Sequence, residues 1–151
     1  MTIAKPRVFI VQEHEDANLV LNGLLWLKGC ESHKFTNGKD CLEKMSQLEG
    51  KIDVIIIGGN IASDRNLPLI INIKKINNNT KVLVIADEDS EKTRILGYGA
   101  DEFSLKPMSP ENVADKVLML ISRDKVRENR WMGFEITEHK IFKKINYLLL
   151  Y

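Results

Sequence analysis

Residues 51–64, with the sequence KIDVIIIGGNIASD, decide the fold class. The run VIII at 54–57 consists only of β-branched residues, which is typical of a strand that is buried on both faces. Such strands form the interior of parallel sheets, where helices cover both sides. The run then ends in Gly58 and Gly59. At this end of a parallel strand, α/β proteins place ligands and catalytic side chains, so two residues without side chains raise a question about function.

The rest of the chain alternates between short apolar runs and amphipathic segments. We expect strands at 7–11, 31–35, 53–57, 81–86 and 102–105, with 31–35 at an edge. We expect helices at 17–29, 38–48, 67–76, 90–99 and 109–129. Five βα units joined by right-handed crossovers predict an α/β fold with a doubly wound, five-stranded parallel sheet.

Finer features of the helices can also be predicted. Asn66 and Ser109 are candidate N-caps, and Gly29 is placed to end the first helix. The leucines of the first helix are expected to face the core; they are Leu21, Leu24, Leu25 and Leu27.

Composition bounds the function. The 151 residues are 44% apolar and carry 22 basic against 21 acidic residues, so neither a membrane surface nor nucleic acid is indicated as a partner. Cys30 and Cys41 lie in no CxxC motif and are interpreted as reduced thiols. No apolar run approaches the length of a membrane span or a secretory signal. We therefore expect a cytoplasmic location.

Residues 123–151 do not fit the βα pattern. They are interpreted as an extension of the last helix followed by an apolar and basic helical tail. One face of that tail is apolar and lysines flank it; the residues are Ile141, Ile145, Leu148, Leu149, Lys140, Lys143 and Lys144. Three alternatives stay open: the tail packs on its own domain, it binds a partner or a second copy, or it begins a truncated output region.

Five motifs in order carry a family resemblance. The most specific is GADEFSLKPMSPENV at 99–113. The others are RVFIVQEHED with the helix after it, TNGKDCLEKM, IDVIII and the spacing of the loop from Gly58 to Leu67. Together, residues 6–122 resemble the receiver domain of two-component response regulators. The resemblance implies a flavodoxin-like fold and a bacterial phosphorelay function.

The resemblance also implies a set of functional positions. In the family, an aspartate ending the third strand accepts a phosphoryl group, and two acidic residues after the first strand hold Mg²⁺ with it. A hydroxyl residue ending the fourth strand and a lysine after the fifth bind the phosphate. Here these positions fall on Gly58, on Gln12 and Glu13, on Ala86 and on Lys106. Only the lysine is intact, and Phe103 falls at the aromatic switch position on the fifth strand.

These departures agree with one another. Gly58 offers no nucleophile, Ala86 has no hydroxyl group, and Glu13 alone is a poor ligand set for Mg²⁺. We therefore expect a degenerate receiver, or pseudo-receiver, that is not an enzyme and has neither a cofactor nor a metal.

Other residues near the site are interpreted as having no direct functional role. Asp64, Asp87, Glu88 and Asp89 follow strands and are interpreted as solvated loop acids rather than surrogate acceptors. His14 has no second ligand nearby in the sequence. We expect Lys106 to pair with Glu13. The resemblance implies a cis peptide before Pro107, and Phe103 is expected to be a packed or half-exposed side chain.

Two functions from different classes remain. The first is a phosphorylation-independent interaction module that binds a protein partner or a second copy through residues 90–122 and 131–151. The second is a sensor that binds a small anion or nucleotide near Lys106, in the crevice at the carboxyl ends of the strands. No nucleotide-binding motif supports this alternative.

Overall fold

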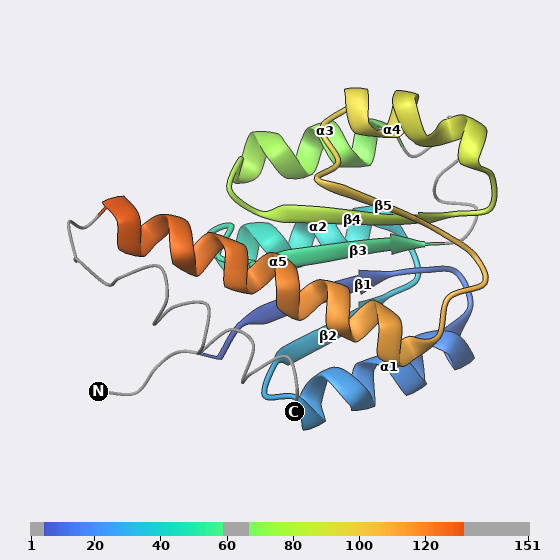
Figure 1. Cartoon of the computed structure of the whole chain (residues 1–151), viewed down its shortest axis with the longest axis horizontal. Coiled ribbons are helices and arrows are strands. Elements are labelled where there is room, and N and C mark those ends of the chain that lie inside the picture. The colour runs from blue at the N-terminus through green and yellow to red at the C-terminus, as the bar shows by residue number, and fades with distance from the viewer. Residues whose placement is uncertain (1–4, 59–66, 132–151) are drawn as a thin grey trace.

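A five-stranded parallel sheet forms the centre of the molecule, in the order β2-β1-β3-β4-β5 (Figure 1). The computed structural model describes residues 5–58 and 67–131, except for the side chains of 15–17 and 124–131. The strands are β1 (Arg7–Val11), β2 (Glu31–Phe35), β3 (Val54–Gly58), β4 (Lys81–Ala86) and β5 (Glu102–Leu105). The helices are α1 (Glu15–Leu27), α2 (Gly38–Gln47), α3 (Leu67–Ile76), α4 (Lys92–Gly97), with the short 3-10 turn η2 (Asp89–Glu91) before it, and α5 (Pro110–Trp131). The predicted doubly wound α/β fold is confirmed.

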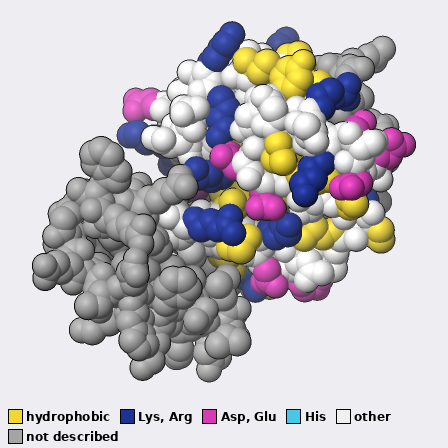
Figure 2. Space-filling model, turned by 45° about the horizontal axis from the view of Figure 1, so that its top comes forward, with side chains coloured by type: hydrophobic (Ala, Val, Ile, Leu, Met, Phe, Trp, Pro, Cys, Tyr) yellow, Lys and Arg dark blue, Asp and Glu magenta, His cyan; other side chains and the backbone are white. Residues whose placement is uncertain are grey.

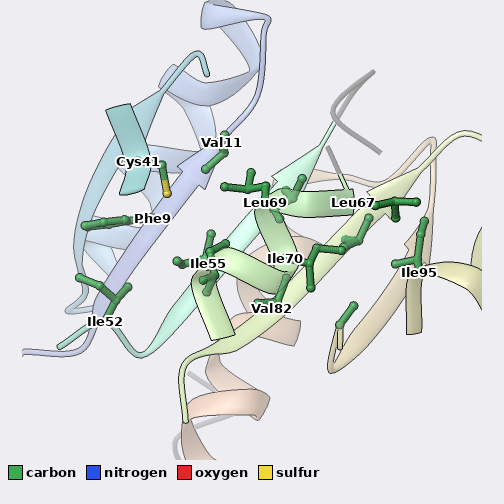
Figure 3. Packing of buried hydrophobic residues seen from close by; sticks show 14 of the residues in the cluster. Phe9, Val11, Cys41, Ile52, Ile55, Leu67, Leu69, Ile70, Val82 and Ile95 are labelled. Carbon is green, nitrogen blue, oxygen red and sulfur yellow. The ribbon is translucent and has the colours of Figure 1, made fainter. Parts of the chain in front are cut away.

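The two faces of the sheet bury two separate clusters of apolar side chains. Because side chains alternate along a strand, Ile55 and Ile57 of β3 face α2, α3 and α4, whereas Val54 and Ile56 face α1 and α5. Figure 3 shows part of the first cluster, in which Cys41 of α2 lies beside Phe9 of β1. Burial on both faces explains why the central strand reads as an unbroken apolar run.

Helix α1 corrects one prediction. Leu21 and Leu25 are buried and Leu24 is partly buried, but Leu27 is 87% exposed. A residue two positions after Leu25 lies on the opposite side of a helix, so both cannot face the same sheet. The buried face is completed at the other end by Asn18, whose Nδ2 donates a hydrogen bond to the carbonyl oxygen of Gln12 at 3.0 Å.

Several helix ends also differ from the expected ones. Helix α1 begins and ends two residues earlier than predicted, and Gly29 follows it with a φ of +90°, a conformation that glycine adopts without strain. Helix α4 is shorter than expected because η2 precedes it. Ser109 caps α5, since its Oγ accepts a hydrogen bond from the backbone N–H of Asn112 at 3.2 Å. Asn66 lies outside the described residues.

The carboxylate of Asp101 ties three elements together. Its Oδ2 accepts hydrogen bonds from Lys74 Nζ of α3 at 2.7 Å and from the backbone N–H of Val82 of β4 at 2.8 Å. Lys74 Nζ also donates to the carbonyl oxygen of Thr80 at 2.7 Å. These bonds fix the amino-terminal ends of β4 and β5 and leave the opposite ends of the strands for other contacts.

Both cysteines, Cys30 and Cys41, are buried. Burial raises the pKa of the Cys41 thiol to about 12, so the thiol stays protonated and unreactive near neutral pH.

The surface mixes charges of both signs. Figure 2 shows basic and acidic side chains interspersed with a few hydrophobic ones on the described part of that face. In the residues that the structure describes, no helix combines the length and the apolar character that crossing a bilayer requires.

Replacing the Asp101 carboxylate tests its structural role. We expect Asp101→Ala to lower the free energy of unfolding by about 1–3 kcal/mol, because two partly buried donors lose their acceptor. The measurement is urea denaturation followed by circular dichroism. The control is Asp115→Ala on the exposed side of α5, which should change stability by less than about 0.5 kcal/mol. Equal effects of the two substitutions would contradict this role.

Candidate functional site

The positions singled out by the resemblance meet at one edge of the sheet. Gln12 directly follows β1, Gly58 ends β3, Ala86 ends β4 and Lys106 directly follows β5. The register joins these ends, because Val11 pairs with Ile57, Gly58 with Ile85, and Ala86 with Leu105. Glu13 and His14 continue the chain after β1 and are exposed. The parallel topology thus brings four residues from distant parts of the sequence to the edge where α/β proteins bind ligands.

Gly58 is buried, and its environment has room for a side chain. A Cβ atom built on it would lie 3.5 Å from Cδ and 3.7 Å from Oε1 of Gln12, which are ordinary van der Waals distances. Gly58 is not among the glycines with a positive φ. Among the described residues, neither a positive φ nor a close backbone approach therefore requires glycine here. The side-chain amide of Gln12 lies over this position instead.

The partner of Lys106 corrects a second prediction. Lys106 Nζ lies 3.5 Å from Oδ1 of Asp87, and the expected pair with Glu13 is not formed among the described residues. The sheet order explains the difference: Asp87 follows β4, which is adjacent to β5, whereas Glu13 follows β1, which is three strands away from β5. The Asp87 side chain is 61% exposed, so water screens this pair and its contribution to stability is small.

The backbone around Lys106 is well defined. Its N–H donates to the carbonyl oxygen of Ala86 at 2.9 Å, which continues the β4–β5 ladder by one bond. The Lys106–Pro107 peptide bond is cis, as the resemblance implies.

Phe103 and Ala86 lie on the opposite face of the sheet from the apolar cluster of α1 and α5. Both belong to the cluster that faces α2, α3 and α4, and both are buried. Phe103 is therefore a packed side chain, as expected.

Of the described acids that could replace the acceptor, Asp87 contacts the site through Lys106. Asp87, Glu88 and Asp89 are exposed, and Asp89 begins η2. Glu88 accepts a hydrogen bond from Ser90 Oγ at 3.3 Å, which is a local loop contact. His14 stands at the N-cap position of α1 and its side chain makes no capping hydrogen bond. Asp64 lies outside the described residues.

Next to Gly58 and Lys106, in the crevice that the sequence predicts at the carboxyl ends of the strands, there is a cavity whose apolar walls were not predicted. It has a volume of about 340 Å³. Its apolar lining comes from four elements and the loop before α5, and includes Leu21, Ile56, Ile85, Met108 and Val113. Gln12, Gly58 and Lys106 also line it. The signals in the sequence were the pair of glycines after β3 and Lys106 after β5. The walls gave no signal, because their positions read as ordinary core residues.

The described residues do not fit the Mg²⁺ ion that the resemblance implies. Mg²⁺ requires hard oxygen ligands in near-octahedral geometry, usually including carboxylates. Gln12 offers an amide and Gly58 offers no side chain, while the Asp87 carboxylate lies against the Lys106 ammonium group. Among the described side chains, no three of His, Cys, Asp or Glu lie close enough together to hold a metal ion.

Comparison with known proteins decides the family. The model of the response regulator receiver domain matches residues 8–118. The chain belongs to the response regulator receiver domain family. A search of the curated proteins found no match to this chain.

Solved structures agree on the fold of the receiver domain. A response regulator from Thermotoga maritima has a TM-score of 0.70 and 21% identity, and the match covers 79% of this chain and 99% of that one. The signal receiver domain of a putative LuxO repressor protein from Vibrio parahaemolyticus has a TM-score of 0.71 and 16% identity, with coverages of 83% and 96%. An orphan response regulator of H. pylori has a TM-score of 0.66 and 18% identity, with coverages of 77% and 96%.

The poor ligand set predicts weak or absent binding of Mg²⁺. Titration calorimetry with millimolar MgCl₂ should give no saturable heat. The comparison variant is Gln12→Asp/Gly58→Asp, which places two carboxylates beside Glu13 and should gain measurable binding. Saturable binding by the unchanged chain that disappears in Glu13→Ala would overturn this expectation.

Proposed function

We infer that this receiver domain acts in signal transduction without accepting a phosphoryl group, as a protein-interaction module. One observation carries the proposal: at the position that the family resemblance assigns to the acceptor aspartate stands the buried Gly58, with the amide of Gln12 over it. Phosphoryl transfer to a side chain needs an oxygen nucleophile in line with the donor, and glycine has none.

The neighbouring positions support the same proposal. Ala86 cannot donate a hydrogen bond to a phosphate group, and the Lys106 ammonium group has Asp87 as its partner. In the family, the acceptor, the hydroxyl residue and the lysine act together on one phosphate. A chain that has lost the acceptor gains nothing from the hydroxyl group, so the two departures form one consistent change.

A single resting conformation follows from the proposal. A ligand shifts a conformational equilibrium only if it interacts differently with the two states. With no phosphate at Gly58 and no hydroxyl group at Ala86, no such difference arises, and Phe103 keeps its packed position. Regulation would then come from the availability of the partner.

We assign the interaction to residues 90–122 together with the tail at 131–151. Exposed apolar side chains on α4 and β5 support the first part, namely Leu96, Tyr98 and Leu105. The second part rests on the apolar pattern of the tail sequence, because 132–151 lie outside the described residues. The partner is a protein or a second copy of this chain. We propose no enzymatic activity, no nucleic-acid binding by this chain, and a location in the bacterial cytoplasm.

A phosphodonor tests the loss of acceptance. Incubation with acetyl phosphate and Mg²⁺, followed by intact-mass spectrometry, should give no phosphoryl adduct on the unchanged chain. Gly58→Asp alone should label weakly, and Gln12→Asp/Gly58→Asp should label well, because the second carboxylate restores a metal ligand. Gly97→Asp is the matched control: it adds the same side chain in open space on α4 and should not label. A stoichiometric adduct on the unchanged chain would mean that a surrogate acceptor exists.

Light scattering tests the interaction surface. We expect the apparent mass of the 151-residue chain to rise with concentration, and a chain that ends at Trp131 to show a smaller rise, because it keeps all of α5 but lacks the apolar tail. Tyr98→Ser should also weaken association. The matched control is Leu27→Ser on α1, which removes a more exposed apolar side chain outside the proposed surface. If Leu27→Ser alone abolishes association, the surface has been assigned to the wrong helix.

A further inference from the structure

The cavity beside Gly58 has the size and composition of a small-molecule site. Pockets that bind small ligands are concave, mostly apolar and contain a few polar groups that orient the ligand, with volumes from about 300 Å³ upward. Here a half-open cavity of about 340 Å³ lies between β3, β4, α1 and α5. The buried side chains of Leu21, Ile56 and Val113 provide apolar walls.

Gly58 leaves this space open. A larger side chain at this position would project from the end of β3 toward the Gln12 amide and into the cavity that both residues line. The backbone conformation does not require glycine at position 58. The space is open because this residue has no side chain, and not because of the turn. The same residue that removes the phosphoryl acceptor thus provides room for a ligand.

The charged groups indicate what kind of ligand fits. Among the described residues of the lining, Lys106 is the only cationic one. Its contact with Asp87 is 3.5 Å long, which exceeds a normal charge-assisted hydrogen bond, so the ammonium group keeps donors for a closer anion. Among the described residues, a polyanion such as a nucleotide would meet one cation, Lys106, and the nearby Asp87 carboxylate. Lys106 can neutralise one negative charge on a ligand, but not several.

We propose that this cavity binds a small molecule with an apolar body and a single anionic group, such as an aryl-substituted carboxylate. The apolar body lies against the walls of Leu21, Ile56 and Val113, and the anionic group accepts hydrogen bonds from Lys106. The Gln12 amide adds a polar contact near Gly58. Lys106, Met108 and Val113 belong to the 90–122 segment, but the exposed apolar side chains that support the docking surface, Leu96, Tyr98 and Leu105, do not line the cavity. Either assignment can therefore fail without the other.

The test is a titration of the ¹⁵N-labelled chain with 4-phenylbutyrate, followed by ¹H–¹⁵N correlation spectra. We expect saturable shifts of the amides of Gln12, Gly58 and Lys106. The neutral amide 4-phenylbutyramide, which has the same apolar body, should bind about tenfold more weakly because it cannot form the charge-assisted bond. Inorganic phosphate, which has charge but no apolar body, should not shift these amides.

Four variants locate the ligand. Lys106→Gln should weaken binding of 4-phenylbutyrate about tenfold, whereas the matched control Lys92→Gln, at an exposed position on α4, should leave it unchanged. Gly58→Val should abolish binding by filling the cavity. Met108→Trp, at a partly exposed position of the lining, gives the same test if Gly58→Val fails to fold, which thermal unfolding will show.

Three outcomes would overturn the proposal. The first is the lack of saturable shifts around the cavity at millimolar 4-phenylbutyrate. The second is equal binding of the acid and the amide, which would remove the role of Lys106. The third is unchanged binding in a folded Gly58→Val or Met108→Trp variant, which would place the ligand elsewhere.

Discussion

Burial of β3 on both faces is the constraint on which the rest of the structure depends. Its residues Val54–Gly58 are all buried, with α2, α3 and α4 on one side and α1 and α5 on the other. A strand in this position must have parallel neighbours and crossover helices, which fixes the order of the sheet. It also fixes where the carboxyl end of the strand emerges, between the ends of β1 and β4. The chemistry of the site therefore depends mainly on the residue at the carboxyl end of this strand.

That residue is Gly58, and two consequences follow from its lack of a side chain. The first is chemical, since no oxygen is available to attack a phosphodonor at this position. The second is steric, since the space beside Gln12 and Lys106 forms part of a cavity of about 340 Å³. The fold of a receiver domain is thus retained, with its packing centred on β3, while the edge of the sheet presents a mainly apolar site with one cation.

Much of the fold could be predicted from the sequence because it depends on periodicity. The strands at 7–11, 31–35, 81–86 and 102–105 and the helix at 67–76 have the predicted bounds. Leu27 was placed wrongly because a leucine-rich helix offers more than one apolar face, and packing selects only one of them. The cap of α5 at Ser109 was predicted because it involves residues close in sequence.

The contacts of the site were harder to predict because they depend on which strands are adjacent. The topology was expected, and the four positions do meet at one edge, but the partner of Lys106 depends on the distance between strand ends. Asp87 is one strand away and Glu13 is three. The cavity gave almost no signal, since Leu21, Ile56 and Val113 look the same in sequence whether or not space remains between them.

We propose that no phosphate-driven switch operates in this domain. The decisive measurement is a pair of ¹H–¹⁵N correlation spectra recorded with and without beryllofluoride and Mg²⁺, because beryllofluoride mimics a phosphoryl group on a carboxylate. We expect the amide resonances of Gly58, Ala86, Phe103 and Lys106 to keep their positions in the spectrum. Saturable shifts that begin at the carboxyl ends of β3 and β4 and extend to Phe103 of β5 would contradict it.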